Sequence, residues 1–268
     1  MPELPELEAI ASKLTDDLVG LKIRQARVYN HIILYGTTVD EFQNALPGKT
    51  FESFRADGKF LLVSLSEEYE IVINPMLTGR IRVARKPRQP IKEDTLAVVI
   101  DDRSLWYSDR KKMGRVYLIR NRNYEDVAEF DGRGPSALDS ELDFDIFRTR
   151  IRHFNGQIKN VLRNQRFIKG IGNAYADEIL LFAGILPFRK RSTLSEDEIG
   201  KLYNSMREIL TRFKAILLKR PLNEIALEKR DFLMIHGKRG GICPLCGNRV
   251  SEITANRFKT NYCQTCQK

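Results

Sequence analysis

The cysteines restrict the fold of this chain more than any other feature. All four lie in the last 26 of its 268 residues, as Cys243, Cys246, Cys263 and Cys266. Two C-x2-C pairs separated by sixteen residues can close a tetrahedral zinc site from two short turns. Two disulfides are the alternative, which a reducing compartment disfavours. Four thiolates leave no open coordination position, so we expect one structural Zn²⁺ whose binding folds the tail.

The charge of the chain is unevenly distributed. Its 45 Lys and Arg and 35 Asp and Glu give a net charge of +10, and residues 131–268, with 25 basic and 15 acidic residues, carry the whole excess. Such a surplus is typical of proteins that bind a polyanion, although solvated surface lysines explain it equally well. No apolar run approaches the roughly 18 residues of a membrane helix. The first ten residues do not resemble a signal peptide. We expect a monomeric cytoplasmic or nucleoid-associated protein without a membrane partner.

Two kinds of periodicity divide the chain. Residues 4–18 place leucines and isoleucine on one helical face, with prolines at the start. Between residues 22 and 122, short β-branched and aromatic runs alternate with turn residues, which predicts an antiparallel sandwich. Strands are expected at 22–29, 60–65, 70–74, 81–84, 95–100, 104–107 and 116–119. Helices are expected at 144–153, 157–164, 174–183 and 195–218, with a loop or short helix at 219–236.

These patterns predict a multidomain α+β protein. An N-terminal antiparallel β-sandwich with a leading helix occupies residues 1–130. A helical domain occupies residues 131–236, and a four-cysteine zinc finger with a β-hairpin occupies residues 237–268. The length of the chain suits two domains with a small appendage.

The turn between the second and third helices of the helical domain has the composition of a phosphate site. Gly172 allows close backbone approach, and Asn173 is placed to cap the helix that begins at residue 174. Arg166 and Lys169 stand beside the exposed amides of that helix start, which would bind phosphate. An ordinary capped turn is the alternative interpretation.

The N-terminus offers a nucleophile. An initiator Met followed by Pro is normally removed, which would leave Pro2 with a free secondary amine. An α-amino group titrates at about 7.7–8.0, and the positive end of a helix favours its neutral form. A secondary amine that attacks an aldehydic sugar carbon gives an iminium ion, an electron sink. The adjacent Glu3 can serve as general acid or base. A plain helix start is the alternative.

Four motifs in order resemble the formamidopyrimidine-DNA glycosylase and endonuclease VIII family. They are MPELPELE at the start, Gly58-Lys59, GIGNAYADE at 170–178 and the C-x2-C-x16-C-x2-C tail. The resemblance spans the chain and implies a helix-two-turns-helix element in the helical domain. It also implies an enzyme that flips a damaged base out of double-stranded DNA, releases it and cuts the strand by β,δ-elimination.

The resemblance assigns roles to individual positions. Pro2 is implied as the nucleophile, Glu3 as the group that assists sugar-ring opening, and Lys59 as a contact to phosphate or sugar near the lesion. Asn173 is implied to hold backbone phosphates, with Arg166, Lys169 and Gly172 around it. The four cysteines are implied to hold zinc.

Other positions depart from the family pattern. Leu77, two residues before Gly79, stands where one of three hole-filling side chains is expected, and Lys111 and Met113 replace the usual Arg and Phe of the other two. Phe258 occupies the position of a functional finger Arg, between Arg257 and Lys259; a one-residue shift in a hairpin reverses the side-chain direction. The segment 219–236 is short for a loop that caps oxidised purine, which disfavours 8-oxoguanine as the substrate.

Two classes of function follow. The first is a DNA glycosylase with apurinic/apyrimidinic lyase activity, favoured by Pro2, Glu3, Lys59 and Asn173. The second is a DNA-damage-binding family member with an altered lesion range or no glycosylase activity, which the departures keep open. A generic zinc-ribbon binder of nucleic acid explains the tail and the charge but not the N-terminus.

Overall fold

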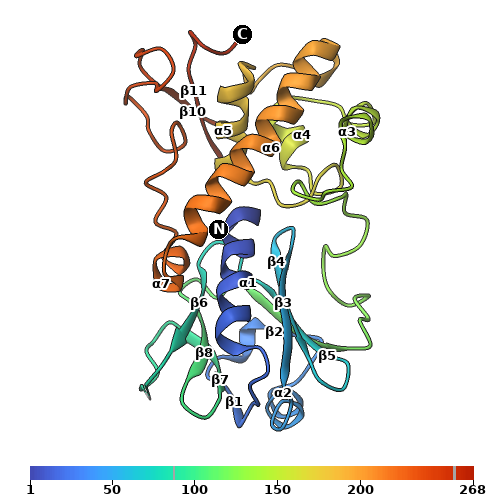
Figure 1. Ribbon diagram of the computed structural model, residues 1–268, viewed down its shortest axis with the longest axis vertical. Coiled ribbons are helices and arrows are strands. Elements are labelled where there is room, and N and C mark those ends of the chain that lie inside the picture. The colour runs from blue at the N-terminus through green and yellow to red at the C-terminus, as the bar shows by residue number, and fades with distance from the viewer. Residues whose placement is uncertain (87, 256–257) are drawn as a thin grey trace. The chain divides into compact units, whose positions relative to one another are not determined.

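The computed structural model describes residues 1–86, 88–255 and 258–268 (Figure 1). It consists of two compact units, each of which is discontinuous in sequence. Unit 1 comprises Met1–Asp131 and Leu217–Lys229, and unit 2 comprises Gly132–Ile216 and Arg230–Lys268. Among the described residues, no helix combines the length and the apolar character needed to cross a membrane.

Unit 1 is the expected β-sandwich. One sheet has the strand order β1-β7-β8-β6 and the other β2-β9-β5-β4-β3, and every pairing is antiparallel except that of β2 with β9. Alternate side chains, such as Ile71 from one sheet and Leu105 from the other, are buried between them. The strands are β1 (Gln25–Val28), β2 (Leu34–Tyr35), β3 (Phe51–Asp57), β4 (Phe60–Leu65), β5 (Tyr69–Asn74), β6 (Gly79–Ala84), β7 (Asp94–Val99), β8 (Ser104–Asp109) and β9 (Arg115–Arg120).

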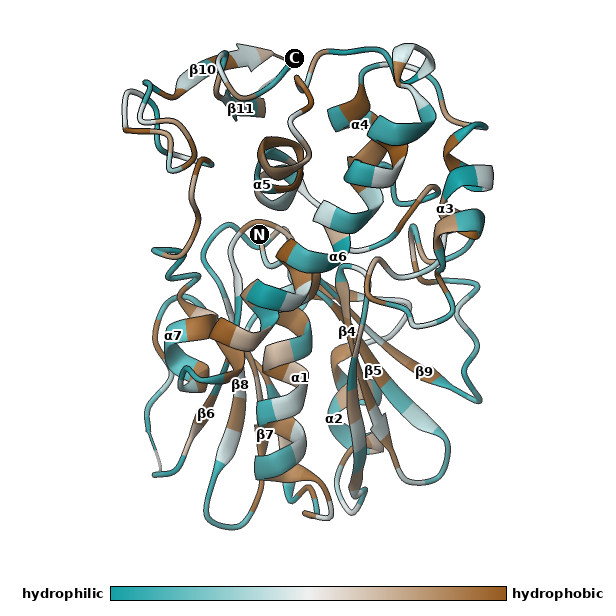
Figure 2. Ribbon diagram, turned by 45° about the horizontal axis from the view of Figure 1, so that its top comes forward, coloured by the Kyte–Doolittle hydropathy of each residue, from teal (hydrophilic) through white to brown (hydrophobic). Residues whose placement is uncertain are grey.

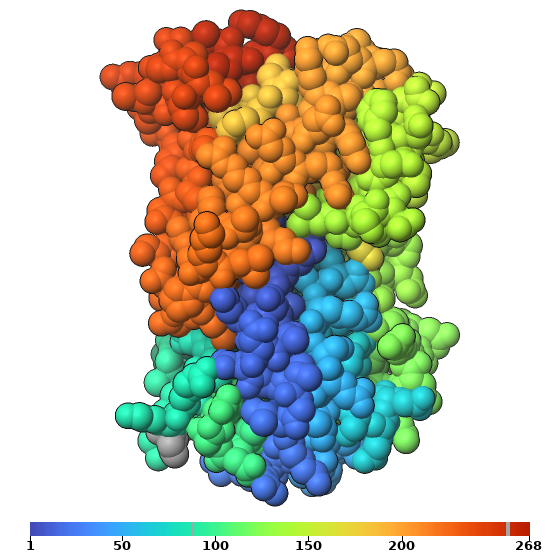
Figure 3. All heavy atoms as spheres, viewed as in Figure 1, coloured from blue at the N-terminus to red at the C-terminus, as the bar shows by residue number. Residues whose placement is uncertain are grey.

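Helices α1 and α7 pack against the sandwich. Helix α1 (Leu4–Leu18) has the predicted bounds and buries its leucine face on β3 and β4, where its atoms form a continuous surface with theirs (Figures 1 and 3). Helix α7 (Leu222–Ala226) packs on α1 and β6. The segment that carries α7 therefore belongs to unit 1, although the sequence boundaries place it with the helical domain. The three-domain boundaries themselves stay a prediction.

Several short elements were not predicted from the hydrophobic periodicity of the sequence. Strand β3 was not predicted, because Arg55 and Asp57 interrupt its apolar residues. Helix α2 (Val39–Ala45) buries only Phe42, so it has no apolar stripe, but its reciprocal cap between Thr38 and Glu41 is a readable start signal. A 3₁₀ turn, η1 (His31–Ile33), precedes β2.

Unit 2 is helical and ends in a hairpin. Helix α5 (Asn173–Ala183) is hydrophobic along most of its length (Figure 2) and buries nearly all its side chains, whereas α6 (Glu196–Leu218) has one apolar face. The hairpin pairs β10 with β11 in antiparallel fashion. The remaining elements are α3 (Phe144–Ile151), α4 (Ile158–Arg163), η2 (Arg191–Thr193), β10 (Ser251–Ala255) and β11 (Phe258–Tyr262). The predicted helical domain and hairpin are confirmed.

The hairpin unit shares a core with α5. Leu181 of α5 packs with Ile235, Val250, Cys243 and Cys263. After the left-handed turn at Gly184 that ends α5, the carbonyl of that glycine accepts the N–H of Lys268 at 3.0 Å. The cysteine-rich tail is thus fixed to the helical part of unit 2 rather than folded alone.

Close packing around Tyr107 gives a stability prediction. A Cβ at Gly114 would lie 1.8 Å from the Tyr107 hydroxyl oxygen, so we expect Gly114→Ala to lower the free energy of unfolding by about 1–3 kcal/mol. That oxygen is buried without a hydrogen-bond partner in the described part of the chain. Tyr107→Phe should therefore leave stability unchanged or raise it, and the double variant should recover most of the loss in urea denaturation. Additive losses would contradict this account.

Candidate functional site

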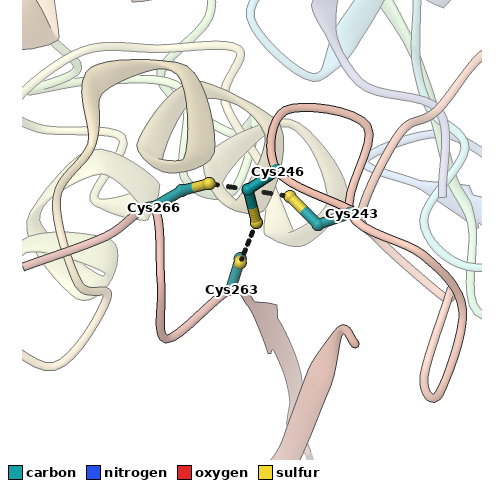
Figure 4. A group of neighbouring side chains, drawn as sticks. All are labelled: Cys243, Cys246, Cys263 and Cys266. Atoms are coloured by element: carbon teal, nitrogen blue, oxygen red, sulfur yellow. Dashed lines mark hydrogen bonds between the residues drawn. The ribbon is translucent and has the colours of Figure 1, made fainter. Parts of the chain in front are cut away.

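The four cysteines form a metal centre. Their sulfur atoms lie within 4.8 Å of one another and point toward a common centre (Figure 4). The Sγ atoms of Cys243 and Cys266 are 3.8 Å apart, and those of Cys246 and Cys263 are 3.5 Å apart. Zinc–sulfur bonds of about 2.3 Å at tetrahedral angles place sulfurs about 3.8 Å apart. All four thiols are free, so the arrangement fits a four-thiolate metal site and not two disulfides.

The surroundings of the sulfurs favour a bound cation. The backbone N–H of Asn248 lowers the pKa of the Cys246 thiol to about 6, so this ligand is a thiolate at neutral pH. Burial raises the pKa of the Cys243 and Cys266 thiols, and a bound cation would stabilise their thiolate forms. The site is closed, which suits a structural metal.

The N-terminal tip of unit 1 lies in a charged cluster. The amine of Met1 forms an ion pair with Glu228, at 3.0 Å from Oε1, and Arg80 Nη1 is 3.2 Å from the same oxygen. Pro2 is buried, and Glu3 is 2% exposed. The N–H of Glu3 donates to Oε2 of Glu6, which is also fully buried. The tip therefore carries several carboxylates beside the predicted nucleophile.

Lys59 lies in the turn between β3 and β4. Gly58, with a φ of +66°, makes this turn tight. Lys59 is half-buried there. Its turn belongs to unit 1, as does the N-terminal tip.

The side chains predicted to fill the hole left by the flipped base come from two loops of unit 1, one before β6 and one after β8. Leu77, in the turn before β6, is 44% exposed, and Met113, after β8, is 41% exposed. Buried Asp109 accepts the N–H groups of Lys111 at 3.2 Å and of Gly114 at 2.7 Å, and it also accepts the hydroxyl of Thr78. Leu77, Lys111 and Met113 are thus presented together, with the Lys111 side chain exposed.

The turn between α4 and α5 corrects one expectation. Asn173 was predicted to cap a helix beginning at residue 174, but α5 begins at Asn173 itself and Gly172 is the N-cap residue. The Asn173 amide group instead donates to the carbonyl of Lys259 at 2.9 Å, and its Oδ1 is buried without a hydrogen-bond partner in the described part of the chain. Arg166 is exposed and Lys169 half-buried beside it.

A buried ion pair holds the hairpin against these helices. Lys159 Nζ lies 2.6 Å from Asp177 Oδ1 and donates to the carbonyl of Lys259 at 3.0 Å and to Thr260 Oγ1 at 2.9 Å. Phe258 is exposed at the start of β11, and the Lys259 side chain lies 3.5 Å from Glu252. Arg257 lies outside the described residues.

Sequence reasoning missed some of these groups. Glu228 meets the N-terminal amine from 227 residues away, which no local pattern reveals. Gln165 organises the turn before α5 by accepting the N–H of Gly170 and donating to the carbonyls of Arg163 and Ile171. Glu6 carried a signal, because a Glu three residues after the N-cap residue, here Glu3, is part of a capping box.

Comparison with known proteins decides the family. Residues 1–116 match the profile of the formamidopyrimidine-DNA glycosylase N-terminal domain, and residues 133–220 match that of its H2TH domain. The chain belongs to the formamidopyrimidine-DNA glycosylase family. The family resemblance inferred from the motifs is confirmed, as is the expectation of a DNA glycosylase at the level of the family.

Individual family members match over their full length. The formamidopyrimidine-DNA glycosylases of Carboxydothermus hydrogenoformans and Lactococcus lactis are each 31% identical to the chain, with 100% of both chains covered. A solved complex of the Lactococcus lactis protein with DNA containing an abasic site has a TM-score of 0.89 at 28% identity, covering 99% of each chain. A complex with DNA containing FAPY-dG has a TM-score of 0.88 at 26% identity, covering 99% of this chain and 100% of the other.

The metal centre yields a direct prediction. We expect one divalent ion per chain by metal analysis and a markedly lower content in Cys263→Ser, because the site loses one of its four thiolates. Hydrogen exchange at the amides of β10 and β11 should increase in this variant while that of the sandwich strands stays unchanged. Gln264 lies between Cys263 and Cys266 but is not a ligand, so the control variant Gln264→Ala should retain the ion. An unchanged metal content together with unchanged exchange in β10 and β11 of Cys263→Ser would contradict a structural metal at this centre.

Proposed function

We propose that this base-excision repair DNA glycosylase also cleaves apurinic/apyrimidinic sites in damaged double-stranded DNA, with Pro2 as its nucleophile. The observation that carries the proposal is the position of the chain tip. The Met1 amine pairs with Glu228, which also pairs with Arg80, and the buried Glu3 follows Pro2 in the chain, so the tip is a polar environment suited to a reacting group. Removal of Met1 leaves the secondary amine of Pro2 at this tip.

The proposed chemistry divides one difficult step into easier ones. The Pro2 nitrogen forms a bond to C1′ of the damaged nucleotide, the glycosidic bond breaks with its electron pair leaving on the base, and the proton lost from the Pro2 nitrogen neutralises the departing base. Glu3 protonates the ring oxygen as the C1′–O4′ bond opens, which yields an iminium ion. Loss of a C2′ proton then expels the 3′ phosphate, and loss of a C4′ proton in a second elimination expels the 5′ phosphate. Water hydrolyses the remaining iminium bond and frees Pro2. Lys59 stabilises the charge on the neighbouring phosphate.

The remaining sites serve DNA binding in this proposal. Asn173, with Gly172, Lys169 and Arg166 around it, holds backbone phosphates. Leu77, Met113 and Lys111 fill the hole left by the flipped base, which apolar wedges are known to do. The metal is Zn²⁺, because four thiolates in tetrahedral arrangement suit zinc. It fixes the hairpin that carries Phe258 and Lys259, and binding to DNA places the protein at the nucleoid.

A second candidate is a family member with an altered lesion range or without glycosylase activity. The exposed Phe258, where the resemblance implies a functional Arg, favours it. Lys111 also lacks the planar guanidinium that contacts an orphan base with two hydrogen bonds. Duplexes with single lesions, assayed for base release, distinguish this candidate from the first.

Covalent trapping tests the nucleophile. Borohydride should reduce the iminium ion and link the protein to abasic-site DNA, and Pro2→Gly should reduce the rate of trapping and strand cleavage by at least about tenfold, because a primary amine no longer yields the permanently cationic iminium. Asp16→Asn, on the exposed side of α1, is the matched control. The proposal fails if Pro2→Gly reacts at the wild-type rate, or if mass measurement finds Met1 on the active protein.

Salt dependence tests the partner. The logarithm of the association constant for a duplex with an abasic analogue should fall linearly with the logarithm of salt concentration, with a slope of about −0.9 per neutralised phosphate. Anisotropy titrations at several salt concentrations measure this slope. A flat dependence would count against DNA.

A further inference from the structure

The outer face of the four-stranded sheet in unit 1 carries basic and aromatic side chains. Arg27 of β1 pairs with Ala97 of β7, which pairs in turn with Trp106 of β8. Arg82 of β6 completes this row. Paired residues point to the same face, and Leu105, the neighbour of Trp106 in the strand, is buried between the two sheets. The row therefore lies on the face that points away from the other sheet.

Trp106 is fixed by contacts to its ring and to its indole nitrogen. The Cζ atom of Arg88 lies 3.5 Å from the ring centroid, and Tyr29 stacks on the ring with centroids 5.8 Å apart and an interplanar angle of 4°. The indole Nε1 donates to Ser104 Oγ at 2.6 Å. Because Trp106 is 4% exposed and Tyr29 38% exposed, Tyr29 is the ring of this stack that a ligand can reach.

The arginine beneath the stack is fixed as well. Buried Asp94 accepts both terminal nitrogens of Arg88, at 2.7 and 3.0 Å, and also accepts the hydroxyl of Ser108 at 2.6 Å. A guanidinium bound in this two-pronged manner keeps one orientation. The stack of Arg88, Trp106 and Tyr29 is thus a rigid support.

A hollow of about 220 Å³ lies beside this support and has a positive charge. Both acidic residues in its wall are paired, Asp101 with Arg24 at 2.5 Å and Asp102 with Arg103 at 2.7 Å. The wall also contains two exposed cations, which have no carboxylate partner among the residues that the structure describes. They are Arg27 and Lys86.

The chemistry of the hollow suits a nucleotide. Nε of Arg27 donates to Gln25 at 2.9 Å, which leaves its two terminal nitrogens for an anion, and Lys86 adds a second cation. An exposed ring beside cations is the arrangement that holds a base by stacking and its phosphate by charge. The volume is below the roughly 300–1,000 Å³ of pockets that enclose a drug-sized ligand, so it suits one nucleotide unit of a chain.

The hollow is separated from the loops predicted to fill the hole left by a flipped base. Asp102 precedes the first residue of β8, whereas Met113 follows its last residue, and six residues at about 3.4 Å each make this strand about 17 Å long. A nucleotide in the hollow is therefore distinct from the nucleotides that those loops would contact.

We propose that Tyr29, Arg27 and Lys86 form a second nucleic-acid site, which binds one nucleotide unit of single-stranded DNA. The base stacks on Tyr29, and its phosphate is bound by Arg27 and Lys86. The ligand is single-stranded because a base inside a duplex has both faces covered by its neighbours and cannot stack on a protein ring. The site uses neither Pro2 nor the metal centre, so it goes beyond the proposed function.

A labelled oligothymidylate tests the site in the intact protein saturated with a blunt duplex that contains a tetrahydrofuran abasic analogue. The oligonucleotide should bind by anisotropy although the duplex occupies the first site. Trp106 is the only tryptophan in the sequence, so quenching of its fluorescence locates the binding at the hollow.

Substitutions separate stacking from charge. Tyr29→Leu should weaken oligothymidylate binding about tenfold, and Tyr29→Phe should retain it, because only the first removes the ring. Arg27→Gln and Lys86→Gln should each lower the magnitude of the salt slope by about 0.7, the value for one phosphate of a single strand. Tyr35→Leu is the matched control, because Tyr35 is 42% exposed and stacks on another ring, that of Tyr117, in the other sheet. It should bind like the wild type.

The inference is overturned if the duplex displaces the oligothymidylate, because both would then occupy one site. It is also overturned if Tyr29→Leu and Arg27→Gln bind within twofold of the wild type, or if Tyr35→Leu weakens binding as much as Tyr29→Leu. Borohydride trapping on abasic-site DNA should be unchanged in Arg27→Gln and Lys86→Gln. A failure of the second site is thereby distinguished from a failure of the Pro2 chemistry.

Discussion

The buried carboxylate of Asp177 is the interaction on which the order of unit 2 depends. Its oxygens lie 2.6 Å from Lys159 Nζ, 2.8 Å from His236 Nδ1 and 3.1 Å from the N–H of Asn261. It thereby links α4, α5, the segment before the metal centre and β11. A fully buried charge is tolerated only when it is paired and hydrogen-bonded, and loss of one partner costs about 3–5 kcal/mol. This network connects the segment before the metal centre, the helices on either side of the turn before α5 and strand β11 within unit 2.

In unit 1 too, a buried carboxylate, that of Asp109, fixes exposed loops. Asp109 draws together the loops that present Leu77 and Met113, and the glycines beside them allow the chain to approach Tyr107 closely. Leu77 and Met113 are large apolar side chains that stay exposed, and the buried carboxylate of Asp109 fixes the backbone beside them. The exposed residues are supplied by the loops, and the rigidity comes from the strands that flank them.

Elements with a strong period were predictable from the sequence, and contacts between distant segments were not. Helix α1 and strand β4 have the expected bounds because their apolar residues recur without interruption. The helix start at Asn173 was misplaced by one residue, since Gly172 supplies the extended N-cap backbone without a capping side chain. The cysteine spacing identified the metal ligands directly. No local sequence pattern predicts the ion pair of Glu228 with the chain tip or the stacking of Arg163 on Phe258, because each contact joins segments far apart in the sequence.

The discontinuity of both units limits how this protein can be dissected. A fragment ending at Asp131 would retain both sheets but lack α7, and so would bare the apolar surface of α1 and β6 and remove the carboxylate that meets the tip amine. A fragment beginning at Gly132 would carry α7 with nothing to cover it. Neither half would contain a complete unit. The contribution of each unit to activity should therefore be measured with point substitutions in the intact chain.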